Sequence, residues 1–464
     1  MLGIVSCTKH GISKDRRYFV MRMEGEAGTD FIEVRAEFKA GEFVQYGSAE
    51  IKAEDKPGVT VQEAIDRAEG LARQYVKGDA YRTGNDEVDA LTGKMWNRLQ
   101  DAARLLVRKL ELSAPIIVRF HNDADGSGGA YSLYLSVKDF ASGNSLKPNL
   151  VWLMQRGVSY TATDSENDAL IANGYSCIDK PLLMLIDFGT NLESNPGLKG
   201  ARDRFDIIWL DHHPLVKGFA GEALEHYINT WQFGGDSNYT AGLLTSALCK
   251  GFTHADTSEF EGASLIGDYS KYATAKGQDM SALLDFITSD LQAIYGPGKS
   301  NITPQEIESI IGDKDRSTEL LEYANIKLEE AIDRGLKSIK RYSAGSGCIA
   351  LLDFENARSE DSKYPLPGRF ASKLLDRLGE SGMKNAVLVV RVGSYLLMRA
   401  DRELCRRVSL LEVIEEMKSR YPDEISGGGG HRCAGSIKLW NKDAGKEMAN
   451  RLIGVIKPRL EALE

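Results

Sequence analysis

The chain has 464 residues, which is longer than one hydrophobic core usually spans, so we expect two to four domains. Its composition, 42% hydrophobic and 27% charged residues, is typical of a soluble globular protein, and no stretch has the unbroken apolar length of a membrane span. The net charge of −9 argues against a protein that coats duplex DNA by electrostatics alone. The first residues, MLGIVSCTKHG, lack the apolar core of a secretory signal, which predicts a cytoplasmic protein.

The N-terminal region predicts a small sheet followed by helices. Apolar side chains alternate with polar ones in residues 17–52, most clearly at Ile32, Val34, Ala36 and Phe38, and several glycines interrupt the run. A small antiparallel sheet explains this pattern, and an OB-like barrel is the alternative. The spacing becomes helical from Val61 to Leu110.

Residues 111–270 alternate short apolar runs with helical stretches. The runs are PIIVRF at 115–120, PLLMLIDF at 181–188 and FDIIWL at 205–210. Near-continuous apolar strands separated by helices predict a parallel sheet that is covered on both faces.

The remainder predicts a helical segment and a second α/β region. Residues 271–345 are mostly helical in pattern, with one long amphipathic helix over residues 319–343 that would serve as a connector. Strand and helix patterns return from residue 346, and a glycine run precedes a last strand, AGSIKLW. We therefore predict an α/β protein with four parts: an accessory region at 1–110, a parallel-sheet domain at 111–270, a helical connector at 271–345 and a smaller α/β domain at 346–464.

The six cysteines are scattered along the chain and form no C-x-x-C pair. This spacing argues against a zinc ribbon or a disulfide framework. We predict that they are reduced packing residues.

Acidic and imidazole side chains follow the three predicted parallel strands. The first strand leads into HNDADG at 121–126, the second ends at Asp187, and the third ends at Asp211, His212 and His213. The carboxyl ends of parallel strands meet at one edge of a sheet, so we expect these groups to lie together. Burying several carboxylates is costly unless cations neutralise them, and few Lys or Arg flank these positions.

A metal site explains this pattern better than a set of salt bridges. Oxygen and imidazole ligands without thiolate favour Mn²⁺ over a closed zinc site, with Mg²⁺ as the alternative. Two such cations would activate water and stabilise charge on phosphoryl oxygens. Taken alone, the D-H-H triplet fits a helix cap and the H-x-D-x-D-G stretch fits a turn, and only their order after separate strands favours a metal site.

These motifs resemble a known family. HNDADG, Asp187 in LLMLIDFG, LDHHP and Asp268 in LIGDY are similar to the four successive motifs of the DHH phosphoesterases. The stretch GGGGHRCAG resembles the glycine-rich signature of the DHH-associated C-terminal domain. The spacing and layout are most similar to RecJ-like archaeal nucleases, while residues 1–110 have no counterpart.

The resemblance implies two cation sites that share one ligand. Asp123 and Asp187 would hold the first cation, and His121 would either bind it or orient a ligand. The implied ligands of the second cation are Asp125, Asp187, His212 and Asp268. Asp211 would orient a histidine, and His213 would contact the scissile phosphate or the nucleophilic water. Asn229 and residues 237–242 resemble a further stretch near the site.

The C-terminal motif is implied to bind the substrate. Its implied contact residues are Arg399, Gly428, Gly429, Gly430, His431 and Arg432. A glycine run lets backbone amides approach an anion, and His431 and Arg432 add donors for phosphate. A flexible linker is the alternative, although a linker rarely leads straight into an apolar strand. Arg406 and Arg407 fit a solvated face.

The resemblance implies a two-metal exonuclease that acts on single-stranded DNA or RNA, or on short oligonucleotides. A phosphodiesterase or phosphatase for dinucleotides, cyclic dinucleotides or bisphosphorylated nucleosides is the second hypothesis. A scaffold that associates with replication proteins is the third, although the complete set of Asp and His positions argues against a purely structural role. Either a monomer or a homo-oligomer is compatible with the sequence.

Overall fold

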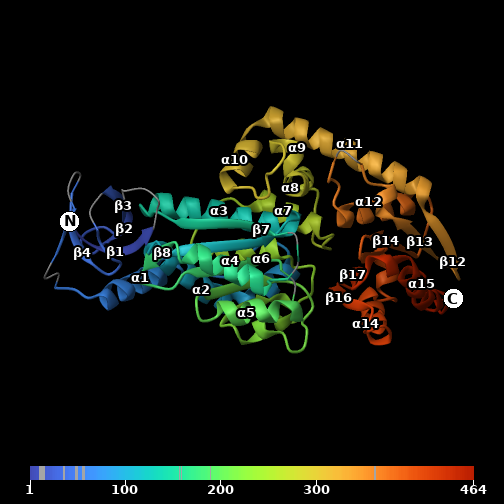
Figure 1. Ribbon diagram of the computed structural model, residues 1–464, viewed down its shortest axis with the longest axis horizontal. Coiled ribbons are helices and arrows are strands. Elements are labelled where there is room, and N and C mark those ends of the chain that lie inside the picture. The colour runs from blue at the N-terminus through green and yellow to red at the C-terminus, as the bar shows by residue number, and fades with distance from the viewer. Residues whose placement is uncertain are drawn as a thin grey trace. The chain divides into compact units, whose positions relative to one another are not determined.

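The computed structural model describes the whole chain except residues 10–15, 35–36, 48–50, 55–57, 156, 158, 189, 360–361 and 464. It contains two compact units (Figure 1). Unit 1 comprises Met1–Leu284 and Asn301–Glu308, and unit 2 comprises Asp285–Ser300 and Ser309–Glu464. Among the described helices, none is both long and apolar enough to cross a bilayer. The four-part division expected from the sequence stays a prediction.

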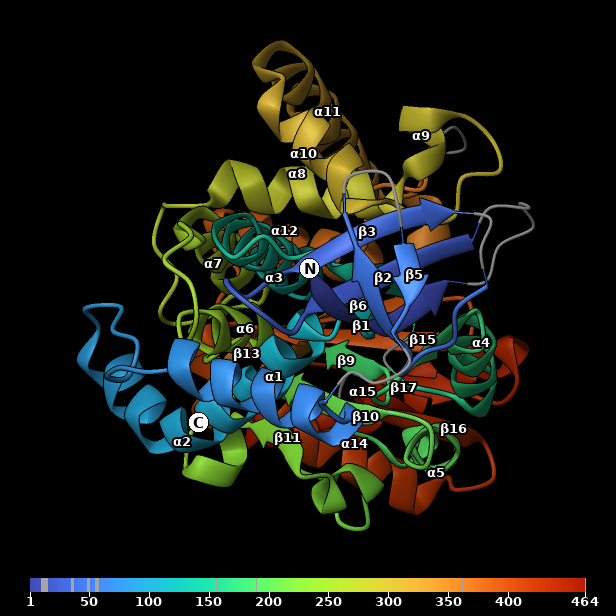
Figure 2. The ribbon, with the colours of Figure 1, turned by 90° about the vertical axis from the view of Figure 1, so that its left-hand side faces the viewer.

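The N-terminal region of unit 1 is an antiparallel sheet in the order β3-β2-β1-β4-β5, and β8 also pairs with β1. Its strands are β1 (Leu2–Lys9), β2 (Arg16–Arg22), β3 (Thr29–Val34), β4 (Phe43–Tyr46), β5 (Ile51–Ala53) and β8 (Tyr175–Cys177). Figure 2 shows this sheet beside helix α1 (Val61–Tyr75), and helix α2 (Asp86–Glu111) packs against α1. Small residues of α1, Ala64 and Ala68, pack against Leu2 and Ile4 of β1. The predicted β-rich N-terminal region is confirmed, while Ala36 of the predicted alternation lies outside the described residues.

A five-stranded parallel sheet in the order β11-β10-β9-β6-β7 forms the centre of unit 1. The strands are β6 (Pro115–His121), β7 (Asn149–Gln155), β9 (Leu182–Ile186), β10 (Asp206–Asp211) and β11 (His226–Asn229). The three apolar runs form β6, β9 and β10, as predicted. The sequence pattern did not identify β7 and β11, because these strands flank the central three and β7 is only partly buried.

Helices cover both faces of this sheet. On one face, Leu183, Leu185 and Trp209 pack against Leu198 of α5 and the buried Tyr160. On the other face lie α3 and α6, which contact β9. The helices of unit 1 in this region are α3 (Ala124–Gly143), α4 (Ala162–Ala172), α5 (Asn195–Ala201), α6 (Ala241–Cys249) and α7 (Ser258–Gly267). Two-sided cover explains why the central strands are almost continuously apolar.

Unit 2 contains a six-stranded mixed sheet in the order β12-β13-β14-β15-β17-β16. Its strands are β12 (Lys340–Ala344), β13 (Gly347–Asp353), β14 (Ala386–Val392), β15 (Tyr395–Ala400), β16 (Ile425–Gly430) and β17 (Ala434–Leu439). Helices α8 (Gln278–Ser289) and α10 (Pro304–Gly312) include residues of both units. The remaining helices of the chain are α9 (Leu291–Tyr295), α11 (Lys314–Ser338), α12 (Pro367–Glu380), α13 (Arg402–Cys405), α14 (Leu410–Arg420) and α15 (Gly445–Glu461). Residues of α14 and α15 pack with β15 and β17 into one apolar core. The predicted α/β class is confirmed.

One local prediction for unit 2 was wrong, and one alternative is excluded. The long helix ends at Ser338, and Lys340–Ala344 forms β12, because this segment pairs with β13. The flexible linker, which was the alternative for the glycine run, is excluded because Gly427–Gly430 lies in β16 and pairs with β17. In both cases strand pairing overrides the local pattern.

The prediction that all six cysteines are reduced was also wrong. Cys7 is bonded to Cys177, and Cys405 is bonded to Cys433. Cys7 and Cys177 are partners in the pairing of β1 with β8, across a sequence separation of 170 residues. Such proximity arises only from the tertiary fold, so spacing rules do not detect it.

Glu111, at the end of α2, carries a buried carboxyl group. Its side chain is fully buried, and neither carboxyl oxygen has a hydrogen-bond partner among the described residues. Burial raises the pKa of Glu111 from 4.5 to about 7, although the charge of Arg67 lowers it. A raised pKa in the folded state means that the carboxyl stabilises the fold only while protonated, and that this stability is lost as pH rises from 4.5 through 7.

We therefore expect Glu111→Gln to stabilise the protein above pH 7 by up to about 3 kcal/mol and to change stability little at pH 4.5. Urea denaturation of both proteins at the two pH values measures this difference. Glu24→Gln, at an exposed position, is the matched control. An equal effect of Glu111→Gln at both pH values would contradict the expectation.

Candidate metal centre

The segment after β6 begins the site. Asp123 caps α3 by accepting a hydrogen bond from Gly126 N at 3.0 Å, and Asp125 lies in the first turn of that helix. A Cβ atom at Gly126 would lie 2.4 Å from the carbonyl oxygen of His121, so glycine allows the helix to start directly against the strand end. His121 and Asp123 are hydrogen-bonded, with His121 Nδ1 2.8 Å from Asp123 Oδ2.

Asp187 directly follows β9 and has a left-handed backbone, with φ of 62°. This conformation is unfavourable for residues other than glycine, asparagine and aspartate. The Asp187 side chain is buried, and its two carboxylate oxygens face His121 and His212. His121 Nδ1 is 3.5 Å from its Oδ2, and His212 Nε2 is 3.4 Å from its Oδ1.

The end of β10 supplies the D-H-H triplet. Asp211 Oδ1 lies 2.8 Å from His213 Nδ1 and accepts a hydrogen bond from His212 N at 2.9 Å. His212 Nδ1 is 2.9 Å from the carbonyl oxygen of Ser237, which can only accept, so Nδ1 carries the proton and the acceptor nitrogen of the neutral ring is Nε2. That nitrogen lies 3.4 Å from Asp125 and 3.1 Å from Asp268.

The structure thus brings together all eight residues that the sequence predicted for this site in unit 1. They fall into overlapping groups that can each hold a divalent ion: His121, Asp123 and Asp187; Asp125, His212 and Asp268; Asp187, Asp211 and His213. Asp187 lies within 3.5 Å of a histidine from each of the first two groups. This is the position expected of a shared ligand. Asp268, which sequence patterns alone support least as a metal ligand, follows α7 and completes the second group.

The N-terminus of α6 holds Asp125 in place. The Asp125 carboxylate accepts hydrogen bonds from Gly242 N at 2.7 Å, from Ala241 N at 2.9 Å and from the hydroxyl of Ser264. Backbone amides at a helix start carry partial positive charge and favour a carboxylate. A Cβ atom at Gly242 would lie 2.4 Å from Ser264 Oγ and 3.0 Å from Asp125 Oδ1, so only glycine permits this contact.

Burial and neighbouring charges shift the pKa values of the side chains in this site. Burial raises the pKa of Asp268 to about 6, and burial together with the Asp187 carboxylate raises the pKa of Asp125. Burial also opposes ionisation of Asp187, but the neighbouring imidazoles of His121, His212 and His213 lower its pKa below the usual value. Burial lowers the pKa of His121 and His212, and the surrounding carboxylates outweigh it, so the pKa of each imidazole is raised. In the absence of cations, these imidazoles partly neutralise the carboxylates.

The donor set fits divalent cations. The ion pairs of the buried carboxylates Asp125, Asp187 and Asp211 join them to histidines. Asp187 Oδ1 is buried and accepts no hydrogen bond from the described residues. Carboxylate oxygens and imidazole nitrogens without thiolate are ligands typical of Mn²⁺ and other first-row divalent ions. The groups around Asp187 therefore have the chemistry that divalent ions require.

A buried polar network behind Asp211 and His213 was not predicted. The Thr190 hydroxyl donates to Asp211 Oδ2 at 2.8 Å and lies 2.6 Å from the Tyr227 hydroxyl. Asn229 Nδ2 contacts both hydroxyls, at 3.2 and 3.0 Å, and donates to the His213 carbonyl oxygen at 2.9 Å. Asn229 was identified only through the resemblance, and no sequence pattern identified Thr190, which follows β9, or Tyr227, which lies on the missed strand β11.

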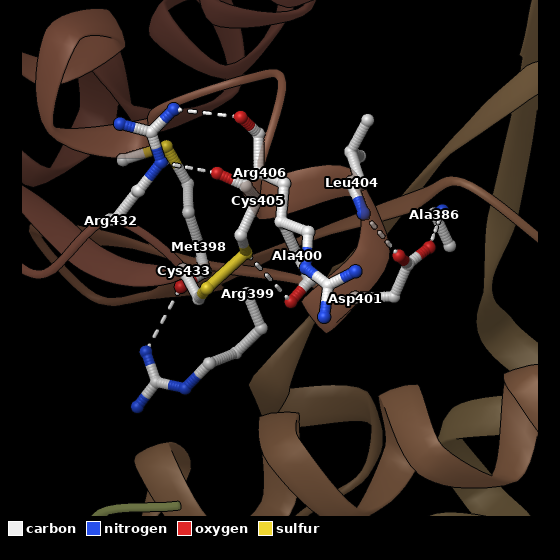
Figure 3. The surroundings of a disulfide bond; sticks show 10 residues. All are labelled: Ala386, Met398, Arg399, Ala400, Asp401, Leu404, Cys405, Arg406, Arg432 and Cys433. Atoms are coloured by element: carbon white, nitrogen blue, oxygen red, sulfur yellow. Dashed lines mark hydrogen bonds between the residues drawn. A yellow bond between two sulfur atoms is a disulfide. The ribbon is translucent and has the colours of Figure 1, made fainter. Parts of the chain in front are cut away.

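The residues predicted to bind substrate lie in unit 2. Gly428, Gly429 and Gly430 form the end of β16, and His431 and Arg432 follow them. Figure 3 shows Arg432 beside the Cys405–Cys433 disulfide, where its guanidinium donates to the carbonyl oxygens of Cys405 and Arg406.

Arg399, also shown in Figure 3, lies on β15 and is held in a different way. It donates to the Met398 carbonyl oxygen at 2.9 Å and to the Ser372 hydroxyl of α12 at 3.0 Å. Both arginines are therefore oriented by the fold of unit 2.

Comparison with known proteins shows the fold. No family model matches the chain. The chain is 23% identical over 431 residues to the uncharacterized protein MJ1198 of Methanocaldococcus jannaschii, an alignment that covers 82% of this chain and 55% of MJ1198. It therefore spans about half the length of the curated relative that it matches.

Two solved structures are similar over most of the chain. One is the DHH domain of a protein that belongs to a family of ribosomal proteins, with a TM-score of 0.70 and 20% identity, covering 85% of this chain and 97% of that one. The other is RecJ of Thermus thermophilus in complex with Mn²⁺, with a TM-score of 0.50 and 13% identity, covering 85% of this chain and 60% of that one. The chain has the fold of the DHH and RecJ proteins, which confirms the resemblance predicted from the sequence.

Proposed function

We propose that this protein is a metal-dependent phosphoesterase that hydrolyses phosphodiester bonds of single-stranded nucleic acid or short oligonucleotides from an end. The observation that carries the proposal is the position of Asp187 between two groups of Asp and His side chains. The fold shared with RecJ supports the nucleic-acid substrate. The fold shared with a DHH domain supports the phosphoesterase chemistry.

We assign the residues as follows. His121, Asp123 and Asp187 would hold one cation, and Asp125, Asp187, His212 and Asp268 would hold the other. The pair would activate a bound water and neutralise charge on the phosphoryl oxygens. Mn²⁺ suits the mixed carboxylate and imidazole donors better than Mg²⁺, which prefers oxygen ligands and retains its waters.

The residues around these groups have distinct tasks in the proposed reaction. Asp211 fixes the ring of His213 through Nδ1, so the contact of His213 with the scissile phosphate or the nucleophilic water would be made at Nε2. The Ser237 carbonyl fixes the tautomer of His212, which directs Nε2 toward the carboxylates. In unit 2, Arg399, His431, Arg432 and the amides of Gly428–Gly430 would bind the phosphates of the strand.

The direct test is hydrolysis of end-labelled substrates by the purified protein with Mn²⁺, Mg²⁺ or EDTA. We expect products that shorten from one end of a single strand with Mn²⁺, weaker activity with Mg²⁺ and none with EDTA. Including a dinucleotide and a cyclic dinucleotide distinguishes a small-substrate phosphodiesterase from an exonuclease. A protein that leaves all of these substrates intact across a range of pH would contradict the proposal, and a scaffold function would then be preferred.

A further inference from the structure

One half-face of the unit 2 sheet, called the open face below, carries exposed and half-buried side chains, and α12 contacts it at β15. On β15, Leu396, Met398 and Ala400 point into the core, while Tyr395, Leu397 and Arg399 alternate with them and are exposed or half-buried. On β17, Ile437 and Leu439 belong to the same core and Ala434, Ser436 and Lys438 alternate with them. Directly opposite strand residues share a face, so Lys438 lies across from Tyr395 and Ser436 from Leu397.

The edge strand extends this open face. Gly427 and Gly429 pair with Lys438 and Ser436, so β16 adds only glycine backbone there. Trp440 directly follows β17, and its N–H donates to the Glu424 carbonyl oxygen at 3.1 Å. Trp440 therefore lies at the end of β17 that carries Lys438, and its side chain is exposed there.

The open face combines cations with aromatic rings. Trp440 is 72% exposed and Tyr395 is 40% exposed, and Lys438 Nζ lies 5.7 Å from the centre of the Tyr395 ring. The open-face strand positions described above carry two cations, Lys438 and Arg399, and no carboxylate, although the chain has a net charge of −9. Exposed rings interleaved with positive charge on a glycine-lined face are the features of a surface that stacks unpaired bases.

We propose that this face is a base-stacking platform for single-stranded nucleic acid, formed by Tyr395, Lys438 and Trp440 and leading to Arg399. The inference rests on the proposed function and deepens it, because it makes strand length a determinant of substrate choice. Arg399 and Tyr395 are four residues apart on one strand, which corresponds to about 13 Å. At a rise of ~3.4 Å per stacked nucleotide, this distance spans about four nucleotides.

The test is binding by the full-length protein in EDTA, which prevents hydrolysis. The probes are a thymidine dinucleotide and a thymidylate strand of about eight nucleotides, twice the expected span. We expect quenching of tryptophan fluorescence by the longer strand, and loss of most of this quenching in Trp440→Phe.

Alanine variants test how much each side chain of the platform contributes to strand binding. Tyr395→Ala and Trp440→Ala should each weaken binding of the longer strand about tenfold, with the dinucleotide unaffected. Lys438→Ala should reduce the slope of log affinity against log salt by about 0.7. Arg406→Ala removes a charge from an exposed side chain that is paired with Glu403, and is the matched control.

Unchanged affinity of the longer strand in all three variants would overturn the inference, and so would an equal loss for both probes. The outcome for the proposed function is separate. If no strand is hydrolysed with Mn²⁺ but strand binding depends on Trp440, the proposed function fails and the platform stands. If strands are hydrolysed and the variants bind like the wild type, the platform is excluded and the function stands.

Discussion

Replacing Asp187 by asparagine is expected to lower the turnover of any phosphodiester substrate at least about a thousandfold, equivalent to about 4 kcal/mol of transition-state stabilisation. The carboxylate of Asp187 lies 3.4 to 3.5 Å from the imidazoles of both His212 and His121. A ligand shared by two cations affects both sites when it loses its charge. Titration of the purified variant with Mn²⁺ should accordingly show weakened binding, independently of activity.

Asparagine is the informative substitution because of the backbone at this position. Asp187 has φ of 62°, a conformation that asparagine tolerates and that costs alanine roughly 1 to 2 kcal/mol. Asp187→Ala should therefore also abolish hydrolysis and additionally lower the thermal stability. Asp203→Asn, at an exposed position in the same unit, should retain activity. Near wild-type turnover in Asp187→Asn would exclude the two-cation model.

The three central strands of the parallel sheet could be predicted because strands that are buried on both faces are almost continuously apolar in sequence. The apolar runs that form β9 and β10 are fully apolar in their centres, and the charged groups begin where each strand ends. Asp187 and the D-H-H triplet were identified for that reason. Strands β7 and β11 have weaker patterns, so the ends of the sheet were missed.

Features that depend on pairing between distant segments could not be predicted from the sequence. The Gly427–Gly430 run favours a loop locally, and it forms a strand because β17 supplies its hydrogen-bond partners. The Cys7–Cys177 bond depends on β8 adding to the N-terminal sheet. The support of Asp211 by Thr190 has the same origin, since it requires β9, β10 and β11 to lie side by side.

Removing the side chain of Asn229 tests whether this support matters for the reaction. Asn229 Nδ2 contacts Thr190 and Tyr227 and donates to the His213 carbonyl oxygen, and all of these groups belong to the buried network behind Asp211. Residues that hold a ligand or a catalytic side chain in place typically contribute about 10- to 100-fold. We expect Asn229→Ala to lower kcat by about that factor with little change in KM, and to cost about 1 to 3 kcal/mol of stability through unsatisfied polar groups.

The Thr190 variants separate positioning from stability. Thr190→Val removes the hydroxyl that donates to Asp211 Oδ2, whereas Thr190→Ser keeps it. If the network positions Asp211 and His213, kcat should fall in Thr190→Val and recover in Thr190→Ser, even when both proteins are assayed well below their unfolding temperatures. If the network only stabilises the fold, Thr190→Val should lose stability, and both variants should retain the wild-type kcat. In that case the link from β11 through Thr190 to the D-H-H triplet would have no part in the reaction.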